Sequence, residues 1–138
     1  MLSANPYLNF NGDCKAAFDF YQSVLGGEFT MVMKFSDMPG PHMGPGEENR
    51  IMHIGLPIGG TMVFGSDCSS SMGTATHGNM FSVCIGGDDE AECRRVFNGL
   101  SEGGKVNMPF EKAPWGDIFG DFTDKFGVSW MVNCTPKQ

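Results

Sequence analysis

Long hydrophobic runs are missing from this 138-residue chain, although hydrophobic residues make up 41% of it. Its apolar segments are only a few residues long, whereas a membrane-spanning helix needs about 20. The first residues, Met-Leu-Ser-Ala-Asn-Pro, contain neither the basic nor the apolar part of a signal peptide. We therefore expect a globular cytoplasmic protein that does not use a membrane.

Positive charge is also scarce. The chain has 9 Lys and Arg against 16 Asp and Glu, which gives a formal net charge of −7. A surface for nucleic acid or for anionic lipid would need the opposite sign. We therefore expect neither as a partner. The acidity is interpreted as an aid to solubility, and a preference for cationic ligands is the alternative.

Paired cysteine motifs are absent as well. The chain has five cysteines, an odd number, and none of them forms a CxxC spacing: Cys14, Cys68, Cys84, Cys93 and Cys134. Free and mostly buried thiols in a reducing cytoplasm are the expected state. Cys84 and Cys134 lie in apolar stretches expected to be strands, where thiols should be inert.

What the chain does contain is a pattern of strand, helix and three strands that occurs twice. In the first half, Asp13 is a candidate N-cap and Gly26-Gly27 ends the helix; strands are expected at about 6–10, 28–35, 49–57 and 61–65. In the second half, Asp89 and Glu92 form a capping-box pattern; strands are expected at 80–85, 105–110, within 115–123, and at 128–134.

The two halves match in sequence as well as in pattern. Leu8–Asp13 corresponds to Val83–Asp88, and Gly60–Phe64 corresponds to Gly127–Met131. One half cannot bury its own sheet face, so two halves should pair. The predicted fold is α+β: two tandem βαβββ modules forming a curved mixed sheet around a cleft. The whole chain, 1–138, forms a single domain with module one at 5–66, a linker at 67–78 and module two at 79–135.

This organisation resembles the vicinal oxygen chelate superfamily, which includes glyoxalase I, extradiol dioxygenases, and fosfomycin and bleomycin resistance proteins. Within it, the chain is most similar to the PhnB-like branch. The motifs that carry the resemblance run over nearly the whole chain: 6–12, 20–21 with 26–28, 51–54, 104–106, 115–116 and 123–133. The resemblance implies the fold, a ligand pocket and a homodimer. Members of this branch carry a demethylubiquinone methyltransferase name, but no glycine-rich turn for S-adenosylmethionine follows the first strand here.

Enzymes of the superfamily bind a divalent metal through His and Glu on the first and last strands of each half. The metal acts as a Lewis acid on the substrate. In this chain the matching positions are Pro6 or its neighbour, Phe64, Phe81 or Ser82, and Met131. None is a His or a carboxylate, and a thioether does not suit Mg²⁺, Mn²⁺ or Fe²⁺. The expectation is therefore no metal cofactor, with a divalent metal at other ligands as the alternative.

The candidate ligand-binding residues lie on the expected inner face of the sheet or beside it: His53, Met62, Phe64, Trp115, Phe119 and Met131. His53 is the best candidate for acid–base work because it lies in the middle of a strand; an imidazole satisfied within the core is the other interpretation. His42 and His77 lie in loops and should be solvated. For the apolar residues, ordinary core packing remains the alternative.

Three functions are compatible with these residues. The first is a small-molecule binding protein that works without the metal, with or without catalysis. The second is a bleomycin-resistance type of protein that sequesters an antibiotic, which the acidity and the aromatic residues favour. The third is a metal-dependent lyase or dioxygenase with unexpected ligands such as His53 and Glu111. Segment 38–48, rich in Pro and Gly, is either a lid or an inert excursion.

Overall fold

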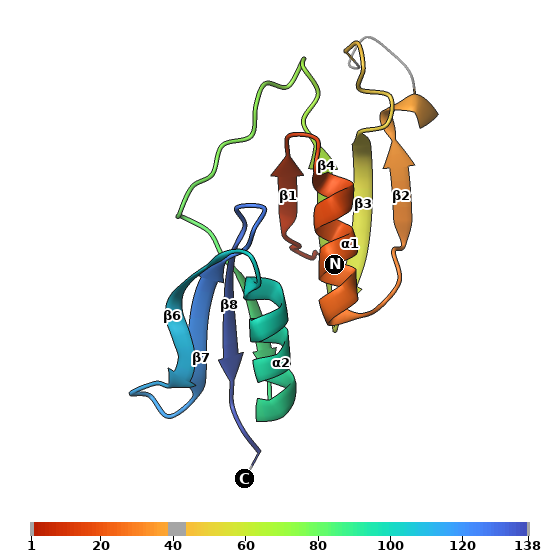
Figure 1. Cartoon of the computed structure of the whole chain (residues 1–138). Helices are drawn as coiled ribbons and strands as arrows, with labels where there is room; N and C mark the ends of the chain where they lie inside the picture. The colour runs from red at the N-terminus through yellow and green to blue at the C-terminus, as the bar shows by residue number, and fades with distance from the viewer. Residues whose placement is uncertain (1, 39–43, 138) are drawn as a thin grey trace. The chain divides into compact units, whose positions relative to one another are not determined.

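The computed structural model describes residues 2–38 and 44–137, which belong to two compact units. Unit 1 is Met1–Thr76 and unit 2 is His77–Gln138. Each unit has a four-stranded sheet, named sheet A in unit 1 and sheet B in unit 2, and one long helix that contacts its own sheet (Figure 1). The boundary between the units falls inside the segment 67–78 that the sequence indicates as a linker.

Unit 1 follows the predicted order of strand, helix and three strands, with one short 3-10 helix added. Its elements are β1 (Tyr7–Phe10), α1 (Cys14–Leu25), β2 (Met31–Lys34), η1 (Phe35–Asp37), β3 (Ile51–Ile58) and β4 (Thr61–Asp67). The strand order in sheet A is β1-β4-β3-β2. The pair β1–β4 is parallel and the others are antiparallel, so the sheet is mixed.

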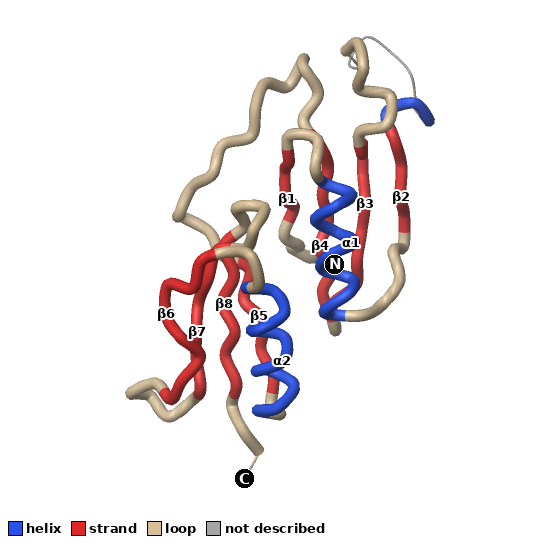
Figure 2. The backbone as a smooth tube through the Cα atoms, in the orientation of Figure 1, coloured by secondary structure: helices blue, strands red, loops and turns tan. Residues whose placement is uncertain are grey.

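Unit 2 repeats this topology. Its elements are β5 (Val83–Gly87), α2 (Glu90–Ser101), β6 (Lys105–Lys112), β7 (Ile118–Thr123) and β8 (Ser129–Cys134). The strand order in sheet B is β5-β8-β7-β6, with β5 parallel to β8 (Figure 2). The predicted α+β fold with tandem βαβββ modules and mixed sheets is therefore confirmed. A shared cleft between the modules stays a prediction.

The predicted match of Leu8–Asp13 with Val83–Asp88 is wrong by two residues, whereas the match of Gly60–Phe64 with Gly127–Met131 agrees with the strand pairing. Phe10 pairs with Asp67 at the end of β1, and its counterpart at the end of β5 is Gly87, which pairs with Cys134. The sequence pattern instead places Gly86-Gly87 in a turn. Gly87 is a residue of β5, and Cys93 Sγ lies 2.6 Å from the position where a Cβ would stand. Close packing against the helix, and not a turn, requires this glycine.

The core of unit 1 lies between α1 and one face of sheet A. The apolar face of α1 is buried at Ala17, Phe18 and Tyr21, while Val24 and Leu25 at the end of the helix are half-buried. On the sheet side the buried partners are Ile54, Leu56 and Val63. Each such side chain contributes roughly 1.5–3 kcal/mol of transfer free energy. This packing leaves the other face of sheet A without a helix from its own unit.

In unit 2 the C-terminal motif is organised by a buried carboxylate. Asp124 is 3% exposed and accepts hydrogen bonds from the backbone N–H groups of Phe126 and Val128, at 2.8 and 3.0 Å. Its other oxygen accepts from the indole N–H of Trp130 at 2.9 Å. Trp130 is fully buried, so it belongs to the core. Its ring is therefore not available to line a ligand-binding surface.

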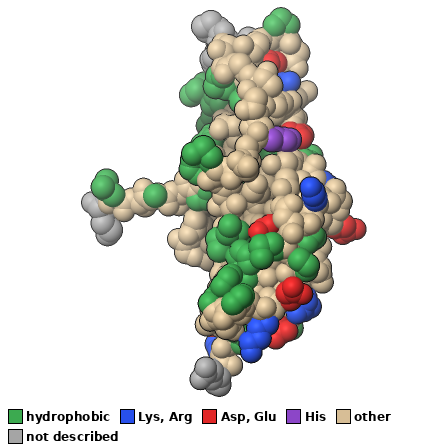
Figure 3. All heavy atoms as spheres, turned by 90° about the vertical axis from the view of Figure 1, so that its left-hand side faces the viewer, with side chains coloured by type: hydrophobic (Ala, Val, Ile, Leu, Met, Phe, Trp, Pro, Cys, Tyr) green, Lys and Arg blue, Asp and Glu red, His purple; other side chains and the backbone are tan. Residues whose placement is uncertain are grey.

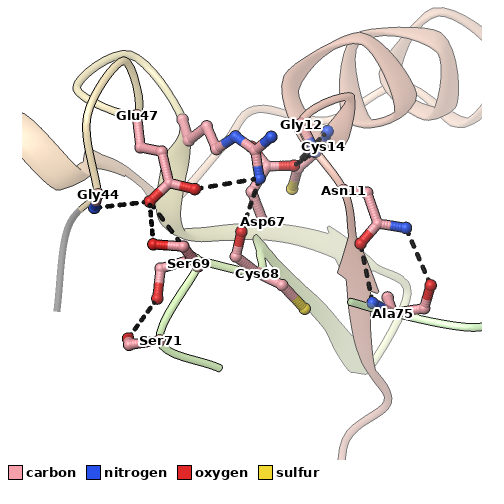
Figure 4. Close-up of polar contacts among 12 residues, drawn as sticks. Asn11, Gly12, Cys14, Gly44, Glu47, Asp67, Cys68, Ser69, Ser71 and Ala75 are labelled. Carbon is pink, nitrogen blue, oxygen red and sulfur yellow. Dashed lines mark hydrogen bonds and ion pairs between the residues drawn. The ribbon is translucent and has the colours of Figure 1, made fainter. Parts of the chain in front are cut away.

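A second buried carboxylate, Asp67 at the end of β4, fixes the start of α1 (Figure 4). It accepts the backbone N–H groups of Gly12, Cys14 and Ile51 at 2.8, 3.0 and 2.9 Å. Asp13 occupies the N-cap position, as predicted, but its side chain makes no capping hydrogen bond. The unpaired N–H groups of a helix start thus receive their acceptor from a strand distant in sequence.

Glu47 joins two loops of unit 1 in the same region (Figure 4). Its Oε1 accepts the backbone N–H groups of Gly44 and Ser70 at 2.7 and 3.2 Å. Arg50 lies 3.7 Å from its Oε2 and donates to the carbonyl of Cys68 at 2.7 Å. The bond from the Gly44 N–H, followed by that from Ser70, lowers the pKa of the Glu47 carboxyl.

No helix in the part of the chain that the structure describes is long and apolar enough to cross a bilayer.

Candidate functional site

The face of sheet A that α1 does not cover carries a compact group of three aromatic rings, named here the open-face patch: Tyr7, His53 and Phe64. The hydroxyl of Tyr7 lies 3.1 Å from Nδ1 of His53. The rings of His53 and Phe64 are stacked, with centroids 5.2 Å apart and planes at 29°. Tyr7 lies 6.3 Å from Phe64 by the same measure. The patch offers flat apolar surfaces together with one imidazole.

The strand register explains why these residues meet. Tyr7 on β1 is the Cα partner of Phe64 on β4, so both point to the same face. Phe64 pairs with Gly55 on β3, and His53 is two residues from Gly55 on that strand. Because side chains alternate along a strand, His53 faces the same way. A β-carbon at Gly55 would meet the side chains of Met62 and Phe64 at 3.1 and 3.3 Å, so both lie over this glycine.

Exposure differs within the open-face patch. Tyr7 is 46% exposed, while His53, Met62 and Phe64 are half-buried. His53 is therefore a strand-face residue with one side toward other rings, and not a fully buried core imidazole. Three of the predicted ligand-binding residues, His53, Met62 and Phe64, thus lie together on one face. Tyr7 was not predicted; only the β1–β4 pairing reveals it, and a single sequence does not show that pairing.

The other three predicted residues belong to sheet B. Met131 is half-buried on β8, and its Cα partners are Cys84 on β5 and Asp121 on β7. Phe119 is half-buried, and its ring centroid lies 5.5 Å from that of Trp115 in an edge-on contact. Trp115 is 62% exposed. Sheet B therefore carries its own apolar group, and the space-filling view shows hydrophobic side chains at the surface in several separate groups (Figure 3).

Unit 2 also has a groove of about 460 Å³ beside α2. Its lining is mixed, with charged and apolar side chains: Glu90, Arg94, Phe110, Glu111, Lys112, Gly116, Ile118 and Pro136. The Arg94 guanidinium lies 5.0 Å over the Phe110 ring and 3.3 Å from Glu90. None of the predicted ligand-binding residues lines this groove. Glu111 does, so the predicted partner of His53 for a metal belongs to the other unit.

The strand pairing shows which residues occupy the positions of the superfamily's metal ligands. Tyr7 and Phe64 are paired in sheet A, and Cys84 and Met131 are paired in sheet B. The predicted positions Phe81 and Ser82 precede β5, so the fifth-strand position is corrected to Cys84. Tyr7 and Phe64 are poor ligands for a hard cation, and a thiol and a thioether suit soft metals. Across residues 2–38 and 44–137, no three His, Cys, Asp or Glu side chains cluster as a metal site would require.

The remaining histidines and the cysteines are placed as follows. His77 is exposed, as expected, and its ring lies against Gly127. His42 and part of segment 38–48 lie outside the described residues. All five cysteines are free. Cys84 is exposed, which corrects the prediction of an inert strand thiol: it lies on the face of the edge strand β5 that α2 does not cover.

Two of the buried thiols have shifted acidities. Burial, with a contribution from the charge of Asp67, raises the pKa of the Cys14 thiol. Burial and a side-chain hydrogen bond with Cys134 raise the pKa of Cys93 to about 11. Both are therefore neutral thiols at physiological pH and poor nucleophiles. They are structural residues, and the open-face patch carries the acid–base candidate.

Several known proteins are similar to this chain in sequence and in architecture. A curated relative, Protein YjdN of Escherichia coli (strain K12), is 32% identical over 97% of this chain and 96% of its own length. The crystal structure of protein PA1353 from Pseudomonas aeruginosa is 39% identical, with a TM-score of 0.89 over 99% of this chain and 100% of that one. A PhnB protein from Bacillus cereus is 26% identical, with a TM-score of 0.80 over 97% of this chain and 100% of its own.

More distant structures share the fold alone. A glyoxylase/bleomycin resistance protein/dioxygenase domain from Frankia sp. EAN1pec is 13% identical, with a TM-score of 0.66 over 97% of this chain and 98% of that one. The family model described as 3-demethylubiquinone-9 3-methyltransferase matches residues 3–133. The chain therefore belongs to this PhnB-like family, and its fold is that of the glyoxylase/bleomycin resistance protein/dioxygenase domains.

Proposed function

We propose that this protein binds a small, flat and largely apolar molecule on the open face of sheet A. The observation that carries the proposal is the stacked pair of His53 and Phe64, half-buried beside Tyr7 on a face without a helix from its own unit. Aromatic side chains offer a large contact area with defined geometry. Binding sites of this kind are mostly apolar, with a few placed polar groups.

We further propose that binding does not use the superfamily's divalent metal. The residues paired at the matching positions are Tyr7 with Phe64 and Cys84 with Met131. These side chains do not fit Mg²⁺, Mn²⁺ or Fe²⁺, which prefer carboxylates and imidazoles. The alternative is a metal-dependent lyase or dioxygenase that draws its ligands from elsewhere, with His53 and Glu111 as the first candidates. That alternative predicts stoichiometric metal in purified protein and its loss in His53→Ala.

We do not extend the family description to a methyltransferase activity for this chain. The first strand is followed by Asn11-Gly12-Asp13, and Asp67 accepts the backbone N–H groups at the start of α1. A cofactor phosphate or carboxylate at a helix start usually meets free N–H groups of a glycine-rich turn. The occupied N–H groups support a binding role over methyl transfer.

A second candidate is sequestration of a cationic aromatic molecule at Trp115 and Phe119 of sheet B. The edge-on pair with an exposed indole and the net charge of −7 favour it. A cation over an indole face gains about 0.5–1 kcal/mol at exposed sites. This site would prefer positively charged ligands, whereas the open-face patch has no carboxylate and would not.

The experiment that separates these sites is a ligand screen by melting temperature, followed by two matched variants. A bound ligand raises the melting temperature, and the rise grows with the logarithm of its concentration relative to its Kd. We expect neutral aromatic fragments to stabilise the protein, and Phe64→Ala to weaken their binding about tenfold through lost ring contact. Phe119→Ala removes a comparable ring from sheet B and should leave it unchanged. The reverse pattern would assign binding to the Trp115 site.

We also propose a cytoplasmic homodimer that binds neither nucleic acid nor membrane. The superfamily resemblance and the acidic net charge support this proposal. Light scattering at micromolar concentration should return twice the 14.9 kDa mass of the chain. A monomeric mass would remove the dimer from the account and leave the open-face patch intact.

A further inference from the structure

Two polar atoms at the open face of sheet A have no hydrogen-bond partner among residues 2–38 and 44–137. Ser66 is only 7% exposed, and within the described ranges its hydroxyl makes no hydrogen bond. The same holds for Nε2 of His53, whose other ring nitrogen meets Tyr7. Buried polar groups are usually hydrogen-bonded, and those that are not require an explanation. A ligand that supplies the missing partner is such an explanation.

The two atoms belong to neighbouring positions on one face. Ile54 pairs with Gly65 at the end of the antiparallel ladder, and continuing that register by one residue places His53 opposite Ser66. Gly65 faces α1, because a β-carbon there would collide with the Phe18 ring. Its neighbours on β4, Phe64 and Ser66, therefore point to the open face. Directly opposed side chains have their β-carbons about 4.5–5.5 Å apart, close enough to share one ligand atom.

The contact with Tyr7 determines which ring nitrogen of His53 carries the proton. A neutral imidazole has one N–H donor and one bare nitrogen that accepts. The bare nitrogen is a better acceptor than a phenol oxygen, which favours the arrangement in which the Tyr7 hydroxyl donates to Nδ1 across the 3.1 Å contact. The ring proton then resides on Nε2, because the hydrogen bond made at one nitrogen sets the state of the other. His53 consequently presents an N–H donor to the ligand.

We infer that the ligand at the open-face patch carries an acceptor oxygen, such as a ketone oxygen, on a flat apolar body. Nε2–H of His53 donates to this oxygen and the hydroxyl of Ser66 donates to it as well, while the flat body lies on Phe64 and Tyr7. Tyr7 is thus a positioning residue for His53. The inference rests on the proposed function, since it names the ligand class for that same site.

The choice between acceptor and donor ligands follows from what each would leave unpaired. A ligand with only donor groups would confront the N–H of His53 with another N–H or O–H. A pure hydrocarbon would bury the Ser66 hydroxyl and Nε2–H without partners. Burying an unpaired polar group costs free energy, so the site would bind such a ligand more weakly. An oxygen acceptor satisfies both groups at once.

The first test needs no ligand. Long-range ¹H–¹⁵N spectra of the histidine ring, recorded at mildly alkaline pH, distinguish protonated from bare ring nitrogens. We expect a protonated Nε2 and a bare Nδ1 for His53, and a larger share of Nδ1–H in Tyr7→Phe, which keeps the ring and removes only the hydroxyl. A protonated Nδ1 in the unaltered protein, or no change in Tyr7→Phe, would overturn the inference.

The second test uses two probes of one shape, acetophenone and α-methylstyrene, which differ by an oxygen in place of a methylene group. Backbone amide shifts of β3 and β4 report their binding. Acetophenone should bind about two- to tenfold more tightly, the usual value of one hydrogen bond. His53→Leu and Ser66→Ala should abolish or reduce this preference, while Ser129→Ala, on sheet B, should preserve it.

The possible results separate the inference from the proposed function. Equal binding of both probes at β3 and β4 would keep the binding site and overturn the acceptor requirement. Shifts confined to sheet B, or none in either sheet with both probes, would overturn the proposed site itself. Preference for acetophenone that survives His53→Leu would assign the donor elsewhere and refute the role of His53.

Discussion

At the scale of single residues, Asp124 ties the last hairpin of unit 2 to its core. Its carboxylate accepts two backbone N–H groups of the turn and the indole N–H of the buried Trp130. Charged acceptors give stronger hydrogen bonds than neutral ones. The contacts of this one residue explain why an Asp and a Trp lie so close together in segment 124–130.

Replacing Asp124 should therefore cost stability. Asp124→Asn loses the charge and gives one acceptor oxygen in place of two, so the free energy of unfolding should fall by about 2 kcal/mol. Urea unfolding monitored by tryptophan fluorescence measures this loss. Asp121→Asn is the control, since no hydrogen bond or ion pair of its side chain occurs among the described residues, and it should change little. Equal losses in the two variants would contradict this role.

Cysteine reactivity is predicted from burial. Cys84 is exposed, whereas Cys14, Cys93 and Cys134 are buried. Burial also raises the pKa of Cys14 and, with a hydrogen bond to Cys134, that of Cys93 to about 11. Iodoacetamide at neutral pH should therefore modify Cys84 first and the three buried thiols only after unfolding. Mass spectrometry locates the label, and labelling of native Cys93 as fast as Cys84 would refute the prediction.

At the scale of elements, the start of α1 depends on a residue from β4. Asp67→Asn should lower the free energy of unfolding by at least about 2 kcal/mol, because three backbone N–H groups share that carboxylate. Asp13→Ala alters the N-cap position itself but removes no hydrogen bond. It should cost less than the usual value of about 1 kcal/mol for a capping residue. A larger loss for Asp13→Ala than for Asp67→Asn would reverse this assignment.

The loop that contains Glu47 should loosen in acid. The pKa of Glu47 is lowered in the folded state, first by the N–H of Gly44. Its contribution to stability is therefore fully present above the unfolded-state pKa and is lost as the pH falls through the folded-state pKa. The free energies of unfolding of Glu47→Gln and the unaltered protein should differ at neutral pH, and the difference should shrink as the pH falls below about 4, the ordinary range of a Glu carboxyl. A constant gap between them down to strong acid would argue against this role.

The elements also show where sequence reasoning succeeds and where it stops. The helical spacing of Cys93, Val96, Phe97 and Leu100 is visible in the sequence and coincides with the buried face of α2, because the period of a helix is a local property. The start of β5 and the packing reason for a glycine at position 87 were not predicted. They depend on Cys93 and Cys134, which are close only after folding. A pattern within one segment predicts the geometry of that segment, whereas strand register depends on two segments that are distant in the sequence.

At the scale of the whole chain, the repeated βαβββ order was predictable and the site only in part. Two periodic segments separated by a Ser/Thr/Gly stretch define two units, each with its own core. His53 and Phe64 were predicted to line a pocket and do share a face. Tyr7 and Ser66 escaped prediction because their place beside His53 follows from pairing across β1, β4 and β3. Nothing in either residue's own sequence neighbourhood marks it.

The central claim is that this protein binds its ligand without the divalent metal of the superfamily whose fold it has. The most direct measurement is elemental analysis of freshly purified protein, together with melting curves in Mn²⁺, Ni²⁺ and Zn²⁺. The residues at Tyr7, Phe64, Cys84 and Met131 predict substoichiometric metal and no stabilisation by added Mn²⁺. Metal near one ion per chain, with stabilisation when it is added back, would contradict the account and point to lyase or dioxygenase chemistry.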